Sequence, residues 1–356
     1  MNDLEALVSL NIIPQIGSVR LSKLLDVFKK PGAIFTAGHK DLASVLGQEI
    51  SQSIVSFDYK RLDSDLSSAR GSGLKIITIL DSEYPKALKE IPGAPIVLYI
   101  FGEILLEDSL AVGIVGSRRA SFYGLNQSEK FAADLAVHGI TVVSGMAKGV
   151  DTYAHRGALK VKGRTIAVIG SGFNHIYPEE NKDLAKEISF SGAVISEFPM
   201  EASPLPQNFP RRNRLISGLS MGVLITEAAK NSGALITADF ALEQGKDVFA
   251  LPGRIDSAMA MGSNALLKQG AKLVTCCEDI FQELNLDTGE KFEMKKPDSL
   301  FGEENQVYGF IGSNATSIDD LIEKTSLPSS RILNSVLKLR FKKLIRQLPG
   351  KQFVRN

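Results

Sequence analysis

The sequence predicts an α/β protein with a doubly wound, mostly parallel sheet at its centre. Five apolar runs, rich in β-branched residues and without alternation, are typical of strands buried on both faces of such a sheet. They are Leu110–Val115, Ile140–Val143, Thr165–Ile169, Ala193–Ile195 and Val223–Ile225. Helix-length segments separate and follow these runs, at Gly124–His138, Asp151–Val161, Glu180–Ser189, Arg211–Leu219 and Gly233–Gln244. This alternation of strands and helices predicts a doubly wound domain, which we expect over residues 76–285.

The regions before and after this domain differ in character. We expect residues 1–75 to form a small helical domain of the SAM or helix-hairpin-helix type. The turn Ile13–Gly17 has two interpretations. It exposes backbone N–H groups to a DNA phosphate, or it only joins two helices that pack against each other. Residues 278–304 hold nine acids against three lysines, so we expect an acidic linker over residues 286–304. A chain of 356 residues with 44% hydrophobic content is long enough for this organisation.

Residues 305–356 are predicted to form a winged-helix module. A capped amphipathic helix at Ser317–Lys324 and a turn precede a helix at Arg331–Arg340, and a hairpin follows. Helix-turn-helix plus wing is a common plan for reading duplex DNA. Residues 329–356 hold eight lysines and arginines and no acid. The candidates for phosphate contacts are Lys338, Arg340, Lys342, Lys343 and Arg346. A module for protein contact is an equally good interpretation.

Hydropathy and cysteine use indicate a cytoplasmic protein. No apolar run approaches the length of a membrane span, and the segment that begins at Met1 is not a signal peptide. Cys276 and Cys277 are adjacent, which suits neither a zinc site nor an ordinary disulfide. We therefore expect no disulfide and no bound metal.

A cluster of arginines marks a candidate anion-binding surface. Arg211, Arg212 and Arg214 lie within four residues, and a guanidinium group presents a planar fork of donors that fits phosphate oxygens. Each predicted strand ends in a turn, and ligands of open parallel sheets bind at these carboxyl ends. Arg118 and Lys148 lie in two of the turns. We expect them to converge with the arginine cluster, where helix N-termini also attract anions.

Signatures of cofactor binding and catalysis are weak. The turn at Gly116 lacks the second glycine of a dinucleotide fingerprint, and no P-loop is present, so we expect no cofactor. Asp151 and His155, spaced i,i+4, fit an oriented base or a structural pair, and we favour the structural pair. We interpret Glu197 as an anchor for the arginines and not as a general acid, because neighbouring cations keep a carboxylate charged. We therefore expect no catalytic residue.

Ordered motifs across nearly the whole chain resemble the DNA-processing protein A family, also called DprA or Smf. The most specific segments are Ser196–Pro199 and the long run Phe209–Ser220. Further matches are Gly116–Arg118 with Tyr123-Gly124, Ser144–Asp151 with Ala154-His155, Gly170–Phe173 with Tyr177-Pro178, Ser232–Ala238 and Leu251–Gly253. The chain departs from the family pattern at Lys148, where arginine is common, and after Pro199, where Met200-Glu-Ala replaces proline-glycine.

The resemblance implies an extended Rossmann-like domain that binds single-stranded DNA without catalysis. It also implies loading of the RecA recombinase onto that strand, in natural transformation and recombination, and a homodimer formed through this domain. The DNA-binding residues that it implies are Gly116, Ser117, Arg118, Ser144, Gly145, Lys148, Gly172, Phe173, Arg211, Arg212, Asn213 and Arg214.

These residues define a mechanism that can be tested. N–H groups around Gly116, Ser117 and Gly145 would hold one phosphate, and the cations would neutralise its neighbours. Phe173 is the candidate platform for base stacking. Charge reversal at Arg118 or Arg212 is expected to abolish strand binding and to leave the melting temperature nearly unchanged.

Two other classes of function compete with this interpretation. One is a nucleotide-processing hydrolase of the lysine-decarboxylase-like Rossmann group, although Thr226–Gly233 lacks the P-G-G-x-G-T-x-x-E loop of that group. The other is a regulator that binds duplex DNA through the winged helix.

Overall fold

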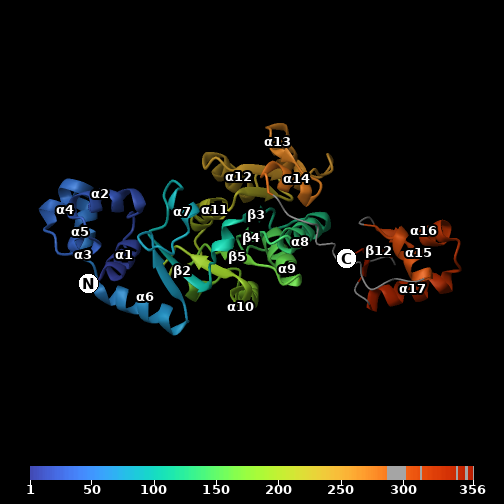
Figure 1. The fold of residues 1–356 in the computed structure, drawn as a ribbon, viewed down its shortest axis with the longest axis horizontal. Coiled ribbons are helices and arrows are strands. Elements are labelled where there is room, and N and C mark those ends of the chain that lie inside the picture. The colour runs from blue at the N-terminus through green and yellow to red at the C-terminus, as the bar shows by residue number, and fades with distance from the viewer. Residues whose placement is uncertain (287–301, 313–314, 342–343, 349–351, 356) are drawn as a thin grey trace. The chain divides into compact units, whose positions relative to one another are not determined.

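Figure 1 shows the computed structural model of the chain, which describes residues 1–286, 302–312, 315–341, 344–348 and 352–355. The chain forms two compact units, Met1–Gly289 and Glu290–Asn356. Residues 287–301, which make up most of the predicted linker, lie outside the described residues, as do Lys342 and Lys343. Within the described ranges, no helix is both long enough and apolar enough to cross a membrane.

Nine strands of the first unit form one sheet. They are β1 Lys75–Thr78, β2 Val97–Gly102, β3 Ala111–Val115, β4 Thr141–Ser144, β5 Thr165–Val168, β6 Ala193–Ser196, β7 Gly222–Ile225, β8 Asp247–Ala250 and β9 Lys272–Leu273. Their order is β1-β2-β6-β5-β4-β3-β7-β8-β9. The strands from β6 to β9 pair in parallel, whereas β2 pairs antiparallel with β6 and β1 with β2. The predicted mostly parallel sheet is therefore confirmed.

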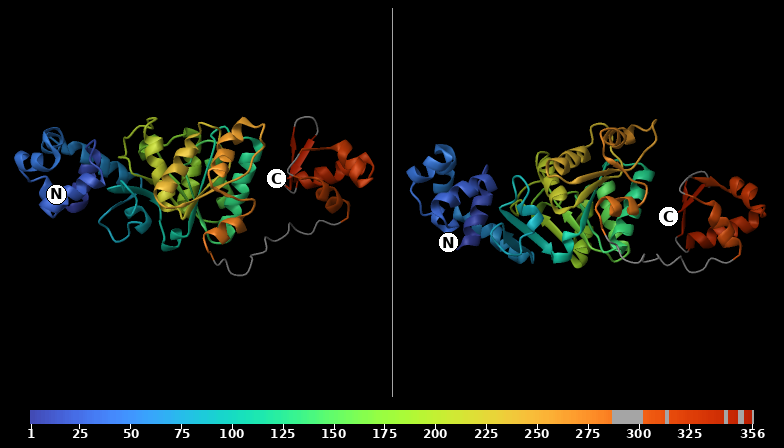
Figure 2. Two further views of the ribbon diagram at one scale, coloured as in Figure 1. Left: turned by 90° about the horizontal axis from the view of Figure 1, so that it is seen from above. Right: turned by 45° about the horizontal axis from the view of Figure 1, so that its top comes forward.

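Helices cover both faces of this sheet (Figure 2). They are α7 Lys86–Lys89, α8 Phe122–Val137, α9 Val150–Lys160, α10 Lys182–Ser191, α11 Asn208–Leu219, α12 Gly233–Glu243, α13 Met261–Lys268 and α14 Cys277–Glu283. Alternate residues of β3 face opposite layers. Val112 and Ile114 pack with α8, α9 and α14, whereas Ala111 and Val115 share a core with α11 and α12. The doubly wound arrangement follows from this burial on both faces.

The order of the parallel strands places a crevice beside β3. The chain winds from β3 outward through β4, β5 and β6, then returns across the sheet through α11 to start β7 on the other side of β3. The connections that follow β3 and β7 therefore lead away from each other at the carboxyl ends of these strands. Open α/β sheets bind their ligands at such a switch point.

The structure adds strands that the sequence patterns did not indicate. The five predicted strands and the five predicted helices of the sheet domain are present within a few residues of their expected bounds. β8, β9 and the antiparallel pair β1 and β2 extend the sheet on both sides. β9 has only two residues, too short for a periodicity argument, whereas β1, β2 and β8, with four to six residues, are as long as the strands that were predicted.

The N-terminal helices pack onto the edge of the sheet near β2. They are α1 Asp3–Ile12, α2 Ser18–Phe28, α3 Pro31–Ile34, α4 His39–Leu46, α5 Gln48–Val55 and α6 Tyr59–Gly71. The carboxylate of Asp65, on α6, accepts a hydrogen bond from the Tyr99 hydroxyl at 2.5 Å and another from the Met200 backbone N–H at 2.7 Å. The Asn11 side chain donates to the Glu197 carbonyl at 3.0 Å. These buried polar contacts join the helical region to the sheet.

The second unit has the winged-helix fold. Its elements are α15 Glu303–Phe310, β10 Thr316–Ser317, α16 Ile318–Thr325, α17 Ser329–Phe341, β11 Ile345–Leu348 and β12 Gln352–Arg355. The strands form a small sheet in the order β10-β12-β11, and α15, α16 and α17 share a core that includes Val307, Leu321 and Val336. Ser317 caps α16, as its sequence predicts. α15 was not predicted from the sequence.

Candidate nucleic-acid interface

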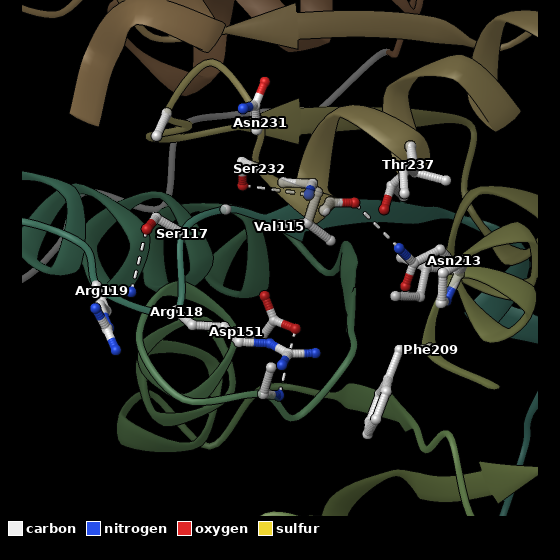
Figure 3. A pocket seen from close by; sticks show the side chains of 18 of the residues that line it. Val115, Ser117, Arg118, Arg119, Asp151, Phe209, Asn213, Asn231, Ser232 and Thr237 are labelled. Carbon is white, nitrogen blue, oxygen red and sulfur yellow. Dashed lines mark hydrogen bonds between the residues drawn. The ribbon is translucent and has the colours of Figure 1, made fainter. Parts of the chain in front are cut away.

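A cleft of about 950 Å³ lies at the switch point, against the carboxyl ends of β3 and β7 (Figure 3). The turns after β3, β4 and β7 line it, together with the first turns of α11 and α12. The charged side chains that line the cleft are Arg118, Arg119, Arg212, Lys230 and Asp151. Four cationic groups thus face one carboxyl group, and the interior attracts anions.

Packing between the turns fixes the loop that follows β3. A Cβ atom on Gly116 would lie 2.6 Å from the Val150 side chain and 2.8 Å from the Glu227 carbonyl, so only glycine fits there. The Ser117 N–H donates to the Glu227 carbonyl at 2.7 Å. The Glu227 carboxylate accepts hydrogen bonds from the Ser121 N–H at 2.6 Å and the Ser121 hydroxyl at 2.7 Å. The Ser117 N–H, expected to hold a phosphate, thus already has a partner, and Glu227 positions the loop.

Two aromatic side chains line the cleft, Phe209 at the start of α11 and Tyr177. The Arg118 guanidinium lies over the Phe209 ring, 5.0 Å from the centroid, and the Tyr177 ring lies 5.7 Å away. Phe173, which the sequence analysis proposed as the stacking platform, lies in a short helical turn and packs partly buried against two hydrophobic cores. Phe209 opens the arginine motif and packs against Gly170, after β5, so its place beside Arg211 and Arg212 in the motif is the signal that could have identified it.

Arg212 forms the floor of the cleft and is only 3% exposed. Its guanidinium donates to the carbonyls of Gly145 and Val168, at the ends of β4 and β5. Burial lowers the pKa of Arg212 to about 10, although Asp151 opposes that shift. A Cβ atom on Gly145 would lie 2.5 Å from this guanidinium, so Gly145 is needed to admit Arg212. The expectation that charge reversal at Arg212 leaves stability unchanged is wrong, because a buried carboxylate would face two carbonyls.

Asp151 lies beside Arg212 at the start of α9. Burial raises the pKa of Asp151 to about 6, and the charge of Arg212 and a hydrogen bond from the Ala147 N–H, at 3.3 Å, oppose the shift. His155, one turn later, contacts the Thr165 hydroxyl at 2.7 Å through Nδ1, and burial lowers its pKa to about 3. The two side chains therefore bond to different partners. This arrangement agrees with structural roles.

Arg211 and Arg214 lie apart from the cleft lining and pair with Glu197. Arg211 reaches the Glu197 carboxylate at 3.2 Å, and Arg214 contacts the same oxygen. Glu197 is 2% exposed, and burial lowers the pKa of Arg214. The interpretation of Glu197 as the anchor of these arginines is confirmed. Of the three clustered arginines, only Arg212 belongs to the cleft.

Five other predicted residues also lie outside the lining of the cleft, namely Ser144, Gly145, Lys148, Gly172 and Phe173. The Lys148 ammonium pairs with Glu180 at 2.6 Å on the surface. The buried Ser144 hydroxyl donates to the Ile114 carbonyl at 2.6 Å. A Cβ atom on Gly172 would collide with the Pro199 carbonyl, so this glycine serves close packing. The predicted convergence therefore holds for Arg118 and Arg212 but leaves Lys148 at the surface.

The wall opposite Asp151 comes from the turn after β7 and from α12. Ser232 caps α12 by accepting from the Ala234 N–H at 3.3 Å, and Asn213 donates to the Gly233 carbonyl at 3.2 Å. Thr237, 1% exposed, turns toward Asn213 (Figure 3), and its hydroxyl has no hydrogen-bond partner among the described residues. Sequence reasoning missed Lys230 and this wall, although the turn after β7 is a carboxyl end like that of Arg118.

The cations at the mouth of the cleft are available to a ligand. In the described part of the chain, no ion pair involves Arg118, Arg119 or Lys230. Within the same residues, no group of three histidine, cysteine or acidic side chains could hold a metal ion. The geometry is that of an anion site with an aromatic wall.

These features define a Rossmann-like α/β protein with an anion-attracting switch-point cleft and a separate winged-helix unit. The family model described as DNA recombination-mediator protein A matches residues 75–285, and that of the DprA winged helix domain matches residues 293–351. The chain belongs to this DprA/Smf family.

Relatives and solved structures agree with this assignment. Protein Smf of Escherichia coli is 38% identical over 84% of this chain and 82% of its own, and DNA processing protein DprA of Bacillus subtilis is 42% identical over 68% and 80%. The structure of DprA from Streptococcus pneumoniae matches with a TM-score of 0.69 at 34% identity, over 80% of this chain and 99% of that one. DprA from Helicobacter pylori, whose structure is described as showing its single-stranded DNA binding mode, matches with a TM-score of 0.54 at 32% identity, over 60% and 95%.

Proposed function

We propose that this protein binds single-stranded DNA in the switch-point cleft, without catalysis, and delivers the strand to the RecA recombinase. One observation carries the DNA-binding part. The cleft is lined by three cations that have no ion pair among the described residues, Arg118, Arg119 and Lys230, and by the aromatic ring of Phe209. Cations that track a backbone, together with an aromatic face for a base, are the two components of sequence-tolerant strand binding. The Helicobacter pylori relative, with its single-stranded DNA binding mode, supports the same function here.

The shape of the site favours an unpaired strand. A volume of about 950 Å³ accommodates a nucleotide but not a duplex. The face of Phe209 can stack only with a base that has left its own stack, and in a duplex that costs unpairing energy. We therefore propose that duplex DNA binds this cleft more weakly than a single strand of the same sequence.

The chemistry of the lining supports binding without bond breaking. The only carboxyl group among the described lining residues is Asp151, which faces two arginines, and no histidine lines the described cleft. A hydrolase that acts on the glycosidic bond of a nucleotide needs an available acid or nucleophile at that bond. We therefore propose strand retention, in preference to nucleotide hydrolysis, as the function of the cleft.

The partners of this function are also proposals. The far edge of the sheet exposes apolar side chains that a second copy could cover, with Leu273 of β9 at 49% exposure and the neighbouring Leu242 of α12 at 61%. Unpaired strand edges with exposed leucines are typical of association surfaces. We propose a homodimer through this domain. The RecA partner rests on the family resemblance alone, and loading takes place in recombination and natural transformation.

The winged helix is the basis for the second candidate, a duplex-DNA regulator. Arg331 pairs with Glu303 at 2.7 Å and Lys338 with Glu304 at 3.4 Å, and Arg340 donates to Gln347 at 2.7 Å. In addition, α17 exposes Leu333 and Leu337, one turn apart. An exposed apolar pair between internally paired cations favours protein contact over phosphate contact.

Fluorescence polarisation with oligo-dT and with a duplex of equal length tests the proposal. Arg118→Glu should weaken oligo-dT binding by at least 100-fold, because it places a carboxylate where a phosphate must bind. The control is Lys160→Glu, the same charge change at the last residue of α9, at the end of that helix away from Asp151, where Lys160 pairs with Glu129. Equal losses in the two variants, or tighter binding of the duplex, would contradict the proposed site. Acceleration of RecA filament formation on coated strands, measured in the same variants, tests delivery.

A further inference from the structure

One carboxyl group lies where the proposed ligand must bring its own negative charge. Asp151 lines the cleft and faces Arg212 on α11, Arg118 in the turn after β3 and the Ala147 N–H. His155, the other titratable group on this face of α9, turns toward Thr165. No other described acid lines the cleft. Asp151 therefore balances the charge of Arg212 and, more weakly, that of Arg118, with which it forms no ion pair in the described structure.

We propose that Asp151 is a proton-coupled counter-ion, which takes up a proton when a nucleic-acid phosphate enters the cleft and releases it when the strand leaves. The proposal rests on the proposed binding of single-stranded DNA. It gives a specific role to Asp151, which is not among the DNA-binding residues predicted from the sequence. The proton comes from solvent and bonds to a carboxylate oxygen of Asp151, so the net charge added to the cleft is one unit smaller than the charge of the phosphate.

The physical reason is competition between two anions for the same cations. Arg118 and Arg212 stabilise the ionised Asp151 in a buried site. An incoming phosphate shares those cations and adds a like charge nearby, and like charges in a site of low dielectric do not both remain ionised at little cost. The phosphate is by far the stronger acid, so the proton is taken up by the carboxylate.

The position of Asp151 on the pH scale makes this uptake observable. Burial already brings the pKa of the carboxyl group to about 6 in the empty cleft. Any further rise moves it through the neutral range, so binding near pH 6.5 takes up a substantial fraction of one proton. Linkage then requires the affinity to increase as the pH falls from 7.5 to 5.5, by up to about tenfold per pH unit.

Isothermal titration calorimetry of the full chain with oligo-dT tests the proposal, because thymine has no group that titrates in this range. At pH 6.5, the apparent binding enthalpy is measured in buffers of different ionisation enthalpy, and its slope gives the number of protons taken up. We expect a positive slope for the unmodified chain and a slope near zero for Asp151→Asn, which keeps an acceptor for the Ala147 N–H. The matched control is Asp65→Asn, which changes a buried carboxyl of raised pKa on α6, and it should keep the slope.

Each outcome decides between the two proposals. Binding of oligo-dT with no buffer dependence in the unmodified chain overturns the proton coupling and leaves the proposed function standing. An unchanged slope in Asp151→Asn assigns the proton to another group and also overturns it. Absence of binding overturns the proposed function, and the coupling with it. The unmodified chain alone provides the first comparison, so the test does not depend on the stability of a variant.

Discussion

The switch-point cleft and the winged-helix unit are both rich in cations, but the neighbours of those cations differ. In the cleft, the structure describes no ion pair for Arg118, Arg119 or Lys230. In the winged helix, Arg331 and Lys338 pair with the acids of α15. An anion meets available donors at Arg118, Arg119 and Lys230, whereas at Arg331 and Lys338 it must displace a carboxylate. The difference teaches that the density of cations along a sequence does not identify an anion site, whereas the partners of each cation do.

The largest expected effect separates the buried arginine of the cleft from an exposed one. Arg212→Met leaves the buried carbonyls of Gly145 and Val168 without their donor and leaves Asp151 with Arg118 as its remaining cationic neighbour, which together should cost about 3–5 kcal/mol of unfolding free energy. Arg118→Met, a matched change at an exposed position, should alter that free energy by about 0.5 kcal/mol or less. Urea unfolding of the two variants checks this prediction. If both are equally stable, Arg212 does not form the floor of the cleft.

The aromatic wall gives the next effect, now on affinity. Phe209→Ala should weaken oligo-dT binding by about 1–3 kcal/mol, the usual contribution of one stacked base. Phe173→Ala removes a ring that packs, partly buried, against two hydrophobic cores, so it should lower stability and leave the affinity of the folded protein unchanged. Affinity and melting temperature measured for both variants distinguish the two phenylalanines. The opposite pattern would restore Phe173 as the stacking residue.

The buried histidine of α9 gives a pH effect on stability. The pKa of His155 in the folded chain, about 3, lies below its value in the unfolded chain. Its contribution to stability is therefore present above pH 6.5 and is lost as the pH falls toward 3. Between pH 6.5 and 5.0, the loss should be about 2 kcal/mol greater than in His155→Gln. The pKa of Asp151 is raised, so this carboxyl group makes the folded state more stable as the pH falls below 6. It does so equally in the unmodified chain and in His155→Gln, and the comparison cancels it. Urea unfolding of both proteins at each pH checks this prediction. If the unfolding free energy changes equally with pH in the two, the lowered pKa of His155 is contradicted.

Salt dependence measures how many phosphates the cleft contacts. Three available cations predict a slope of log affinity against log salt of about −2, at about −0.7 for each phosphate on a single strand (3 × 0.7 = 2.1). Arg118→Ala should reduce the magnitude of that slope by about 0.7. Fluorescence polarisation titrations at salt concentrations from about 50 to about 300 mM provide the measurement. A slope unchanged by the substitution would remove Arg118 from the phosphate contacts.

The smallest expected effect belongs to the winged helix. Joint substitution of Arg331, Lys338 and Arg340 by serine should change oligo-dT affinity by about twofold or less, because exposed pairs contribute little and their cations are already partnered. Competition with unlabelled duplex in the same experiment tests the duplex-binding alternative. A loss as large as that of Arg118→Glu would show that both regions bind the strand and would break the comparison.

Much of the site followed from local sequence rules, and the rest depended on contacts between distant segments. The rule that ligands bind at the carboxyl ends of buried strands predicted that Arg118, in a turn, and Arg212, in the arginine motif, would meet in one cleft. The same rule also applies to Lys230, in the turn after β7, which the sequence analysis missed, whereas Phe209 lies on α11 and outside its reach. Lys148 and Phe173 also lie in such turns, but Lys148 pairs with Glu180 and Phe173 packs against two hydrophobic cores. Local spacing specifies which edge of the sheet a turn occupies, but not which neighbour its side chain meets.

The sequence by itself determined the doubly wound α/β domain, the winged helix and the ordered motifs of the DprA/Smf family. Buried strands and capped helices are encoded by residues close together in the chain, so their patterns can be read directly. Only the tertiary structure decided which of three adjacent arginines reaches the cleft. Arg212 meets Gly145, 67 residues away, whereas Arg211 and Arg214 meet Glu197. Successive residues of a helix point in different directions, so the same motif supplies one arginine to the cleft and two to a buried carboxylate.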